Sequence, residues 1–318
     1  MRSSIQLIAA LLLFIVSSRT FAQYAEIDPR TLPAQISAQQ LIVQAAPGNL
    51  DWHAWLKLAV LLQDAGSYRA SENAYRRAIA LLRAPDPLTV ADIFDHMGTM
   101  YVASGQLSNA EPLERHALAI REHQHDILGT GVSHMHLAML LLNRHDLQSA
   151  EAEAQSAVHL LVPESVHRAA AASSSTPSEN ATPEEKMTAL IDLALVKCAS
   201  GAASTALTNL RSALQIAHET YPGNSIPVGY IEFLLGYASW KGGNSNDANI
   251  LMSKGIDTLA LAIDWGQPAY LGALRQYRAF LVDTRQTIEA QRVSAEIARL
   301  DRSAAPPSQV AALQNPPK

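Results

Sequence analysis

The sequence predicts an all-α fold, a right-handed solenoid of about six helix hairpins with an N-terminal capping helix. Two observations predict this fold. A pattern of apolar and small residues returns along most of the chain, and the composition combines 48% hydrophobic with only 6% aromatic residues. Such a chain buries a large core that is filled mainly by small side chains, as close-packed helices require. One hairpin cannot bury its own apolar face, so neighbouring hairpins are expected to stack.

The repeated unit consists of two helices and a turn. In the first copy Trp55, Leu58 and Leu62 lie three or four residues apart, which places them on one helical face. Gly66 ends this helix because a left-handed backbone costs glycine little. The positions equivalent to Leu58 are Met97, Leu137, Leu193, Leu235 and Tyr277, at intervals of 39, 40, 56, 42 and 42 residues. The interval of 56 residues contains an insertion of 14.

The second copy resembles a known repeat family. Its first helix has the spacing Phe94, Met97, Gly98 and Tyr101, and its second helix has small residues at Ala110 and Ala117. This pattern resembles the tetratricopeptide repeat, and the segment 105–122 resembles its kinesin light chain subtype of roughly 42 residues. The resemblance extends over about residues 50–302 and implies a solenoid that binds other proteins. A HEAT or armadillo solenoid, with a period of about 40 to 47 residues, is the alternative fold.

Four residues depart from the family pattern. His145 and Arg285 stand where the turn glycine is expected, Glu232 stands where an aromatic residue is expected, and Ser239 replaces a bulky residue. The small residues at 98, 110 and 117 nevertheless favour the tetratricopeptide interpretation over the HEAT or armadillo one.

The copies and the local composition predict the domain boundaries. The insertion and the C-terminal tail are rich in Ser, Thr, Ala and Pro, which cannot bury enough apolar surface to become ordered. The predicted segments are a signal peptide at 1–22, an N-terminal segment at 23–49 with a capping helix at 34–46, repeats one to three at 50–164, a disordered insertion loop at 165–184, repeats four to six at 185–302 and a disordered tail at 303–318.

The N-terminus predicts export. Arg2 precedes an apolar run from Leu7 to Val16, and a stretch of small and polar residues follows that run. Ten helical residues span about 15 Å, roughly half of a bilayer's hydrocarbon core, so a cleaved signal is favoured over a permanent anchor. We expect cleavage after Ala22, and a periplasmic or secreted mature protein.

Composition excludes several function classes. A net charge of -5, from 24 Lys and Arg against 29 Asp and Glu, provides no basic surface for nucleic acid. The single Cys198 closes no intramolecular disulfide and builds no thiolate zinc site. Its apolar neighbours predict an inert packing residue rather than a reactive thiol. G-x-S-x-G, Walker, H-E-x-x-H and dinucleotide-binding motifs are missing from the sequence, so we expect no enzyme, no catalytic residues and no cofactor.

The first helices of the hairpins are expected to line a concave groove. Kinesin light chain repeats tend to carry Asn in this lining, whereas the middle copies here carry apolar residues. The predicted lining consists of Met135, Met139, Leu142, Ile191, Leu195, Tyr230, Phe233, Tyr237 and Trp240. We therefore expect a non-enzymatic scaffold whose groove binds a peptide or helix of another protein, one of the cell envelope. The alternatives are that tight curvature or the protein's own tail covers the groove, and that the chain is a structural spacer.

Histidines suggest a rival function. Six of the eleven fall within 30 residues, namely His116, His123, His125, His134, His136 and His145. The rival is a His-rich, metal-dependent or enzyme-associated envelope protein. The spacings give no i, i+4 ligand pair, so no metal ligand is assigned. His96 and His136 are equivalent in adjacent copies and are expected to lie near one another and near Asp92 or Asp95. These two aspartates are interpreted as a solvated groove lip, or as a patch that recognises a basic partner.

Overall fold

The computed structural model describes residues 31–45, 51–83, 85–162, 180–261 and 267–303. These residues form thirteen α-helices and no strand. The helices are α3 Leu32–Ala45, α4 Trp52–Asp64, α5 Tyr68–Leu81, α6 Pro87–Ala103, α7 Leu107–His123, α8 Ile127–Asn143, α9 Leu147–Leu161, α10 Pro183–Ala199, α11 Ala203–Thr220, α12 Ile226–Lys241, α13 Ser245–Ala260, α14 Gln267–Asp283 and α15 Thr287–Ser303. The all-α prediction is confirmed.

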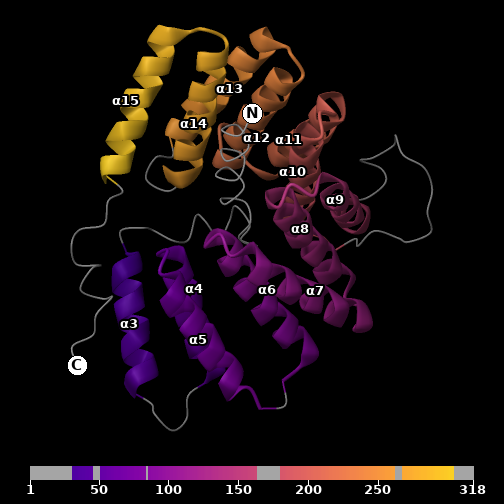
Figure 1. The fold of residues 1–318 in the computed structure, drawn as a ribbon, viewed down its shortest axis with the longest axis vertical. Coiled ribbons are helices and arrows are strands. Elements are labelled where there is room, and N and C mark those ends of the chain that lie inside the picture. Colours follow the sequence, from indigo (N-terminus) through magenta and orange to yellow (C-terminus); the bar gives the residue numbers. More distant parts are fainter. Residues whose placement is uncertain (1–30, 46–50, 84, 163–179, 262–266, 304–318) are drawn as a thin grey trace.

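Six helix hairpins, from α4–α5 to α14–α15, follow α3 and stack into a curved solenoid (Figure 1). The hairpins trace an arc, so that α3 and α15 lie on the same side of the molecule at its two ends (Figure 1). The predicted solenoid of six hairpins and its capping helix are therefore present. No helix among the described residues is long and apolar enough to cross a membrane.

Small side chains hold the two helices of each hairpin close together. Ala110 and Ala117 of α7 are fully buried, as are Ala74 and Ala78 of α5 to within 3%. At Gly98 of α6, an added Cβ atom would lie 2.1 Å from the Glu114 carboxylate. The small residues that the sequence pattern picks out thus lie where the helix backbones approach most closely.

The six hairpin turns share one backbone conformation. Gly66, Gly105, Gly201 and Gly243 have φ between +70° and +85°, and His145 and Arg285 adopt the same left-handed region at +64° and +61°. The amide of the residue after the turn donates to a carbonyl five positions back, as Asp146 does to Leu141 at 3.0 Å. His145 and Arg285 therefore occupy the turn-glycine position without altering the turn.

The turn conformation gives a stability prediction. A side chain in the left-handed region costs roughly 1–2 kcal/mol, which glycine avoids. We expect His145→Gly to raise the free energy of unfolding by about 0.5–1 kcal/mol after the greater freedom of glycine in the unfolded chain is subtracted. Urea denaturation followed by circular dichroism measures this difference. Gly105→Ala is the reciprocal control and should destabilise, whereas a stabilising effect of that substitution would contradict the argument.

Polar pairs join consecutive hairpins at equivalent positions. In each pair a Glu near the start of a second helix contacts the first helix of the next hairpin. The pairs are Glu72 with Tyr101 at 2.8 Å, Glu111 with Arg144, and Glu151 with Lys197 at 2.5 Å. Because such partly exposed pairs contribute little stability, their main effect is to fix the register between repeats.

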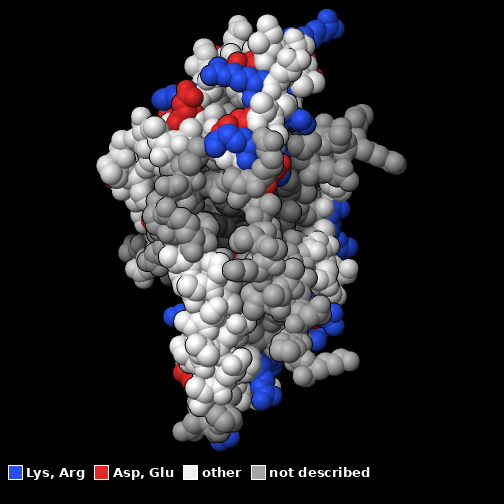
Figure 2. All heavy atoms as spheres, turned by 90° about the vertical axis from the view of Figure 1, so that its left-hand side faces the viewer, with Lys and Arg blue, Asp and Glu red and all other residues white. Residues whose placement is uncertain are grey.

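The two ends of the solenoid differ in charge. The capping helix α3 contains no charged residue, and it packs Ile36 and Val43 against the core while Leu41 and Ile42 remain exposed. Figure 2 shows this contrast on the side where the ends lie: charged side chains gather over the upper part, toward α15, and few appear over the lower part, around α3. The cap therefore covers the first repeat with a largely uncharged surface.

One predicted boundary needs correction. The insertion loop was expected to extend to 184, but α10 begins at Pro183. The Thr182 hydroxyl accepts a hydrogen bond from the Glu185 amide, and the Glu185 carboxylate accepts one from the Thr182 amide. This capping box, followed by a proline at the first helical position, fixes the start of the helix. The signal peptide at 1–22, most of the insertion and all but the first residue of the tail lie outside the described residues.

Candidate functional site

The predicted groove lining lies on first helices of three consecutive hairpins, and most of it is buried. Met135, Met139 and Leu142 belong to α8, and Ile191 and Leu195 belong to α10. The four aromatic members belong to α12, and they are Tyr230, Phe233, Tyr237 and Trp240. Eight of these nine side chains are at most 6% exposed, and Trp240 is partly exposed. The lining is thus continuous with the hydrophobic core.

Trp240 is the last residue of this lining, and it contacts the first helix of the sixth hairpin, α14. Its indole Nε1 donates to the Asp283 carboxylate at 2.9 Å, and its ring lies edge-on to Phe280 with the ring centroids 5.8 Å apart. The Lys241 ammonium lies 4.0 Å from the centroid of the same ring. An aromatic ring with one polar edge and one exposed part is typical of interaction surfaces.

Cys198 lies in the same region and is not reactive. The thiol is 8% exposed on α10, and burial raises its pKa to about 12. The thiolate is the nucleophilic form, so a raised pKa makes this sulfur inert. The sequence-based interpretation as a packing residue agrees with this environment.

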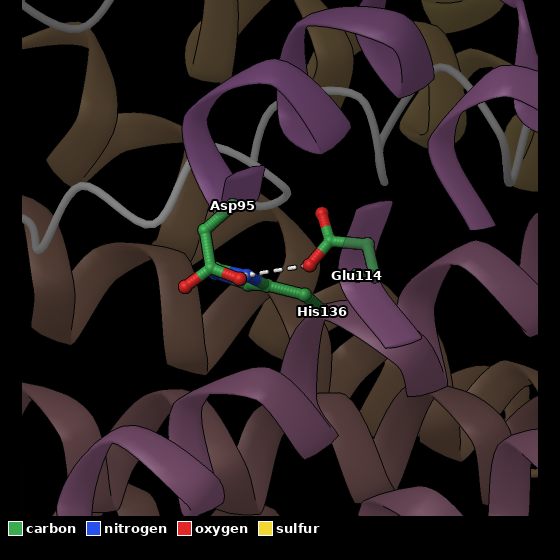
Figure 3. A group of neighbouring side chains, drawn as sticks. All are labelled: Asp95, Glu114 and His136. Carbon is green, nitrogen blue, oxygen red and sulfur yellow. Dashed lines mark hydrogen bonds and ion pairs between the residues drawn. The ribbon is translucent and has the colours of Figure 1, made fainter. Parts of the chain in front are cut away.

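A buried charge cluster lies beside the groove lining, between the second and third hairpins. Asp95 of α6, Glu114 of α7 and His136 of α8 are 4%, 1% and 5% exposed. His136 lies between the two carboxyl groups, with its Nδ1 3.2 Å from Glu114 Oε2 and 3.7 Å from Asp95 Oδ1 (Figure 3). We call these three residues the buried triad.

Arg121 of α7 connects the triad to its surroundings. Its guanidinium donates to the Asp95 carboxylate, to Asp92 Oδ1 at 2.7 Å and to the Ser133 hydroxyl at 2.7 Å. Burial disfavours the charged guanidinium, but Asp95 and Asp92 outweigh this effect and raise the pKa of Arg121. Arg121 thereby links α6 to α8 through Asp95 and Ser133, which are buried with it.

The expectation of a solvated lip at Asp92 and Asp95 is wrong for Asp95. The Asp92 side chain is 62% exposed, but Asp95 is buried against Arg121 and His136. The pKa of Asp95 is lowered although burial alone would raise it, because His136 and Arg121 favour its ionised form. The side chains of Arg121 and His136 therefore lie beside Asp95, where a basic partner was expected to bind.

Burial and charge shift the other titrating groups of the cluster. Burial raises the pKa of Glu114 to about 7 against the opposing effect of His136. Burial alone would lower the pKa of His136, but Glu114 and Asp95 raise it to about 10. Burial also raises the pKa of Asp192 on α10, which is electrostatically coupled to His136. In the folded protein these three groups hold their protons more tightly than in the unfolded chain.

These shifts predict how stability depends on pH. A raised folded-state pKa contributes stability at low pH that is lost as the pH rises through the folded value. For Glu114 and His136 this loss begins near their ordinary pKa values and ends near about 7 and about 10. Because the two groups titrate as a pair, we expect one continuous loss of stability between about pH 5 and about pH 9 rather than two separate steps.

Urea denaturation at several pH values measures how the free energy of unfolding changes with pH. EDTA is present so that metal ions do not contribute. His136→Gln removes the titrating imidazole and should reduce this pH dependence without abolishing it, because Glu114 still titrates and His136 no longer opposes the effect of its burial. A free energy of unfolding that rises from pH 5 to pH 9 in the original chain would contradict the assigned directions.

The other histidines that the structure describes do not converge on the triad. His134 contacts Glu153 at 2.6 Å, His96 stacks on Tyr75, and His116 lies beside Phe94. Glu114, Arg121 and Asp192 were not singled out as site residues from the sequence. Glu114 did carry a signal, since the equivalent positions in four of the other copies are apolar, as Tyr75 and Ala154 show. The triad atoms supply one imidazole nitrogen and two carboxylate oxygens within 4.8 Å of one another, a set able to hold a metal ion.

Comparisons with known proteins agree with this fold. A family model of the tetratricopeptide repeat matches residues 90–123, which lie in α6 and α7. No curated protein shows significant sequence similarity to the chain.

Solved structures show the same architecture. BtubC (BKLC) from P. vanneervenii is 18% identical with a TM-score of 0.54, and the match covers 75% of this chain and 92% of BtubC. A proposed kinesin light chain from Podospora anserina with nearly identical TPR-like repeats is 17% identical, with a TM-score of 0.51 and coverage of 66% and 95%. A Rap protein complexed with competence and sporulation factor is 13% identical, with a TM-score of 0.56 and coverage of 87% and 81%. At these identities the similarity concerns the fold.

Proposed function

We propose that this chain, a tetratricopeptide repeat protein whose repeats resemble those of kinesin light chain, is a non-enzymatic protein–protein interaction scaffold. The first helices of its middle hairpins bind a peptide or an amphipathic helix of a partner protein. The observation that carries the proposal is the unbroken apolar lining from Met135 to Trp240 over three consecutive hairpins. An apolar lining of this kind, once the helices over it separate, suits a helix or strand that presents apolar side chains.

The burial of the lining defines how a partner reaches it. Met139 and Phe233 are at most 1% exposed, so binding requires the first helices to separate from what now contacts them. Trp240 is the member of the lining that a partner meets first, because its ring is partly exposed. Flexible side chains such as Met135 and Met139 then adapt to the bound segment. A Rap protein with the same fold was crystallised with competence and sporulation factor, which supports a binding role for this architecture.

Export follows from the N-terminal sequence. The apolar run between Leu7 and Val16 directs the chain across a membrane, and cleavage after Ala22 releases a periplasmic or secreted protein. The partner is accordingly a protein of the cell envelope. Mass spectrometry of the protein isolated from its host, with a mature N-terminus at Gln23 as the expected result, tests this part of the proposal separately.

Site-specific photo-cross-linking tests groove binding. A photoreactive phenylalanine at position 240 keeps an aromatic ring at the end of the lining, and the same residue at position 250 is the control. Ile250 is 66% exposed on α13, a second helix, and so lies outside the lining. We expect cross-links from position 240 to one partner protein, and none to that partner from position 250.

Two other results are informative. Cross-links from position 240 that are exclusively intramolecular would show that the chain covers its own groove, and they would overturn the proposal. The same partner recovered from both positions would place binding outside the lining, with the same consequence. As a second arm, Trp240→Ala should weaken association with the cross-linked partner at least about tenfold, as expected for an aromatic anchor.

A further inference from the structure

The buried triad has the donor atoms of a metal site. His136 contributes an imidazole nitrogen, and Asp95 and Glu114 each contribute a carboxylate oxygen, from three different helices (Figure 3). Ligand atoms that share an ion at about 2.0–2.2 Å lie about 3–4.2 Å apart. The distances from His136 Nδ1 to Glu114 Oε2, 3.2 Å, and to Asp95 Oδ1, 3.7 Å, already fall in this range.

Unsatisfied atoms provide an independent observation. Asp95 Oδ1, Glu114 Oε1 and His136 Nε2 are buried and have no hydrogen-bond partner among the described residues. Buried polar atoms without a partner are costly and are rare in folded proteins. Asp95 Oδ1 is directed at the imidazole, so an ion next to His136 Nδ1 would satisfy it. No hydrogen bond within the triad satisfies Asp95 Oδ1.

Charge favours a cation at the same place. The buried carboxyl groups of Asp95 and Glu114 contact His136, that of Asp192 interacts with it electrostatically, and the buried Arg121 guanidinium pairs with Asp95. Asp92 and Asp126 add two more carboxylates on the far side of Arg121. Coordination of a divalent cation displaces the His136 proton, so the ion takes over from the imidazolium the compensation of the buried Asp95 and Glu114 carboxylates, which would otherwise be expensive to bury.

The surroundings of the triad support its three ligands. Arg121 binds the second oxygen of Asp95, which leaves Oδ1 free to face the imidazole. Gly98 leaves the space that the Glu114 carboxylate occupies, since any Cβ there would collide with it. Coordination through Nδ1 leaves the His136 proton on Nε2, which has no hydrogen-bond partner among the described residues. Orientation of ligands by outer hydrogen bonds is a common feature of protein metal sites.

We propose that Asp95, Glu114 and His136 bind one divalent first-row transition-metal ion, for which Zn²⁺ is the probe, and that this ion joins the second and third hairpins. One imidazole and two carboxylates suit such ions better than Ca²⁺, which requires six to eight oxygen ligands. The ligands come from α6, α7 and α8, so the ion links helices of two repeats. The inference does not depend on groove binding, because it concerns a separate set of side chains.

Equilibrium dialysis against Zn²⁺, with metal analysis of the full chain, tests the site. The protein is first treated with EDTA, and one sample is also refolded with Zn²⁺ present because the triad is buried. Glu114→Gln keeps the shape of the side chain and removes a charged ligand, and His136→Gln removes the imidazole. His134→Gln is the matched control, because His134 lies two residues away on α8 and contacts Glu153 instead.

We expect about one equivalent of Zn²⁺ in the original chain and in His134→Gln, with affinity at least about tenfold weaker in Glu114→Gln and His136→Gln. Zn²⁺ should raise the melting temperature of the original chain, and this rise should vanish in Glu114→Gln. Substitution by Co²⁺ gives a visible absorption band as a second readout. Less than about a tenth of an equivalent after refolding, or equal binding by Glu114→Gln, would overturn the proposal. Equal loss in His134→Gln would place the ion on the His-rich surface, and would also overturn it.

Discussion

Arg121→Met lowers the free energy of unfolding by about 3–5 kcal/mol, the expected cost of removing one partner from a buried ion pair. The substitution keeps the unbranched stem but leaves the Asp95 carboxylate buried beside Glu114, with only His136 to compensate it. It also removes the hydrogen bonds to Asp92 and Ser133 that connect α6 with α8. Guanidinium or urea denaturation at neutral pH measures the loss.

Arg115→Met is the matched control on the same helix. The Arg115 side chain is half exposed and pairs with Glu111 one turn away, so its loss should change stability by about 0.5 kcal/mol or less. Adding Asp95→Asn to Arg121→Met should restore part of the stability, because it removes the carboxylate that was left unpaired. A loss below about 1 kcal/mol in Arg121→Met would show that Asp95 does not need its guanidinium partner.

Local patterns predict the hairpins well because each hairpin is formed from residues close in sequence. The spacing of Trp55, Leu58 and Leu62 defines a helical face, and a residue in the left-handed region ends each first helix. Even the departures at His145 and Arg285 were located correctly, since the turn requires a particular backbone conformation rather than a particular residue. The spacing of apolar residues and the positions of the turns therefore predict the helix hairpins.

The charge cluster was not predicted because its members come from different repeats. Asp95 looked exposed as a member of a groove-lining position, and only Arg121 and His136, 26 and 41 positions later, explain why it is buried. Glu114 was the available signal: the copies align it with Tyr75, Ala154, Leu210 and Met252, all apolar and at most 1% exposed. A charge at a position that is apolar and buried in four other copies indicates a partner elsewhere in the fold.

The groove lining shows a related limit. The face on which Met139, Leu195 and Tyr237 lie follows from helical periodicity, but their burial depends on how sharply the solenoid curves and on what contacts the first helices. Curvature accumulates from small rotations between neighbouring repeats. Those rotations depend on side chains between neighbouring hairpins, such as Glu111 and Arg144. The sequence of a single repeat does not predict that these two residues pair.

Gly255→Ala destabilises the protein by about 2–3 kcal/mol, although alanine favours a helix by about 1 kcal/mol over glycine. Gly255 lies where α13 crosses α12. A Cβ atom there would lie 2.6 Å from the Gly229 carbonyl oxygen and 2.6 Å from the Phe233 amide nitrogen. Both neighbours are backbone atoms, so neither can rotate away, and the two helices must separate to admit the methyl group. Separation would also loosen Phe233, which is fully buried.

Gly272→Ala is the opposite test in α14. An added Cβ at Gly272 meets no atom within 4 Å, so only the gain in helix propensity remains, and stability should rise by about 0.5–1 kcal/mol. Thermal and urea denaturation of the two variants therefore give effects of opposite sign from the same chemical change. If Gly255→Ala also stabilised the chain, α12 and α13 would have to lie farther apart than the structure places them. That result would contradict the close approach of the α12 and α13 backbones at Gly255, on which the packing of this hairpin depends.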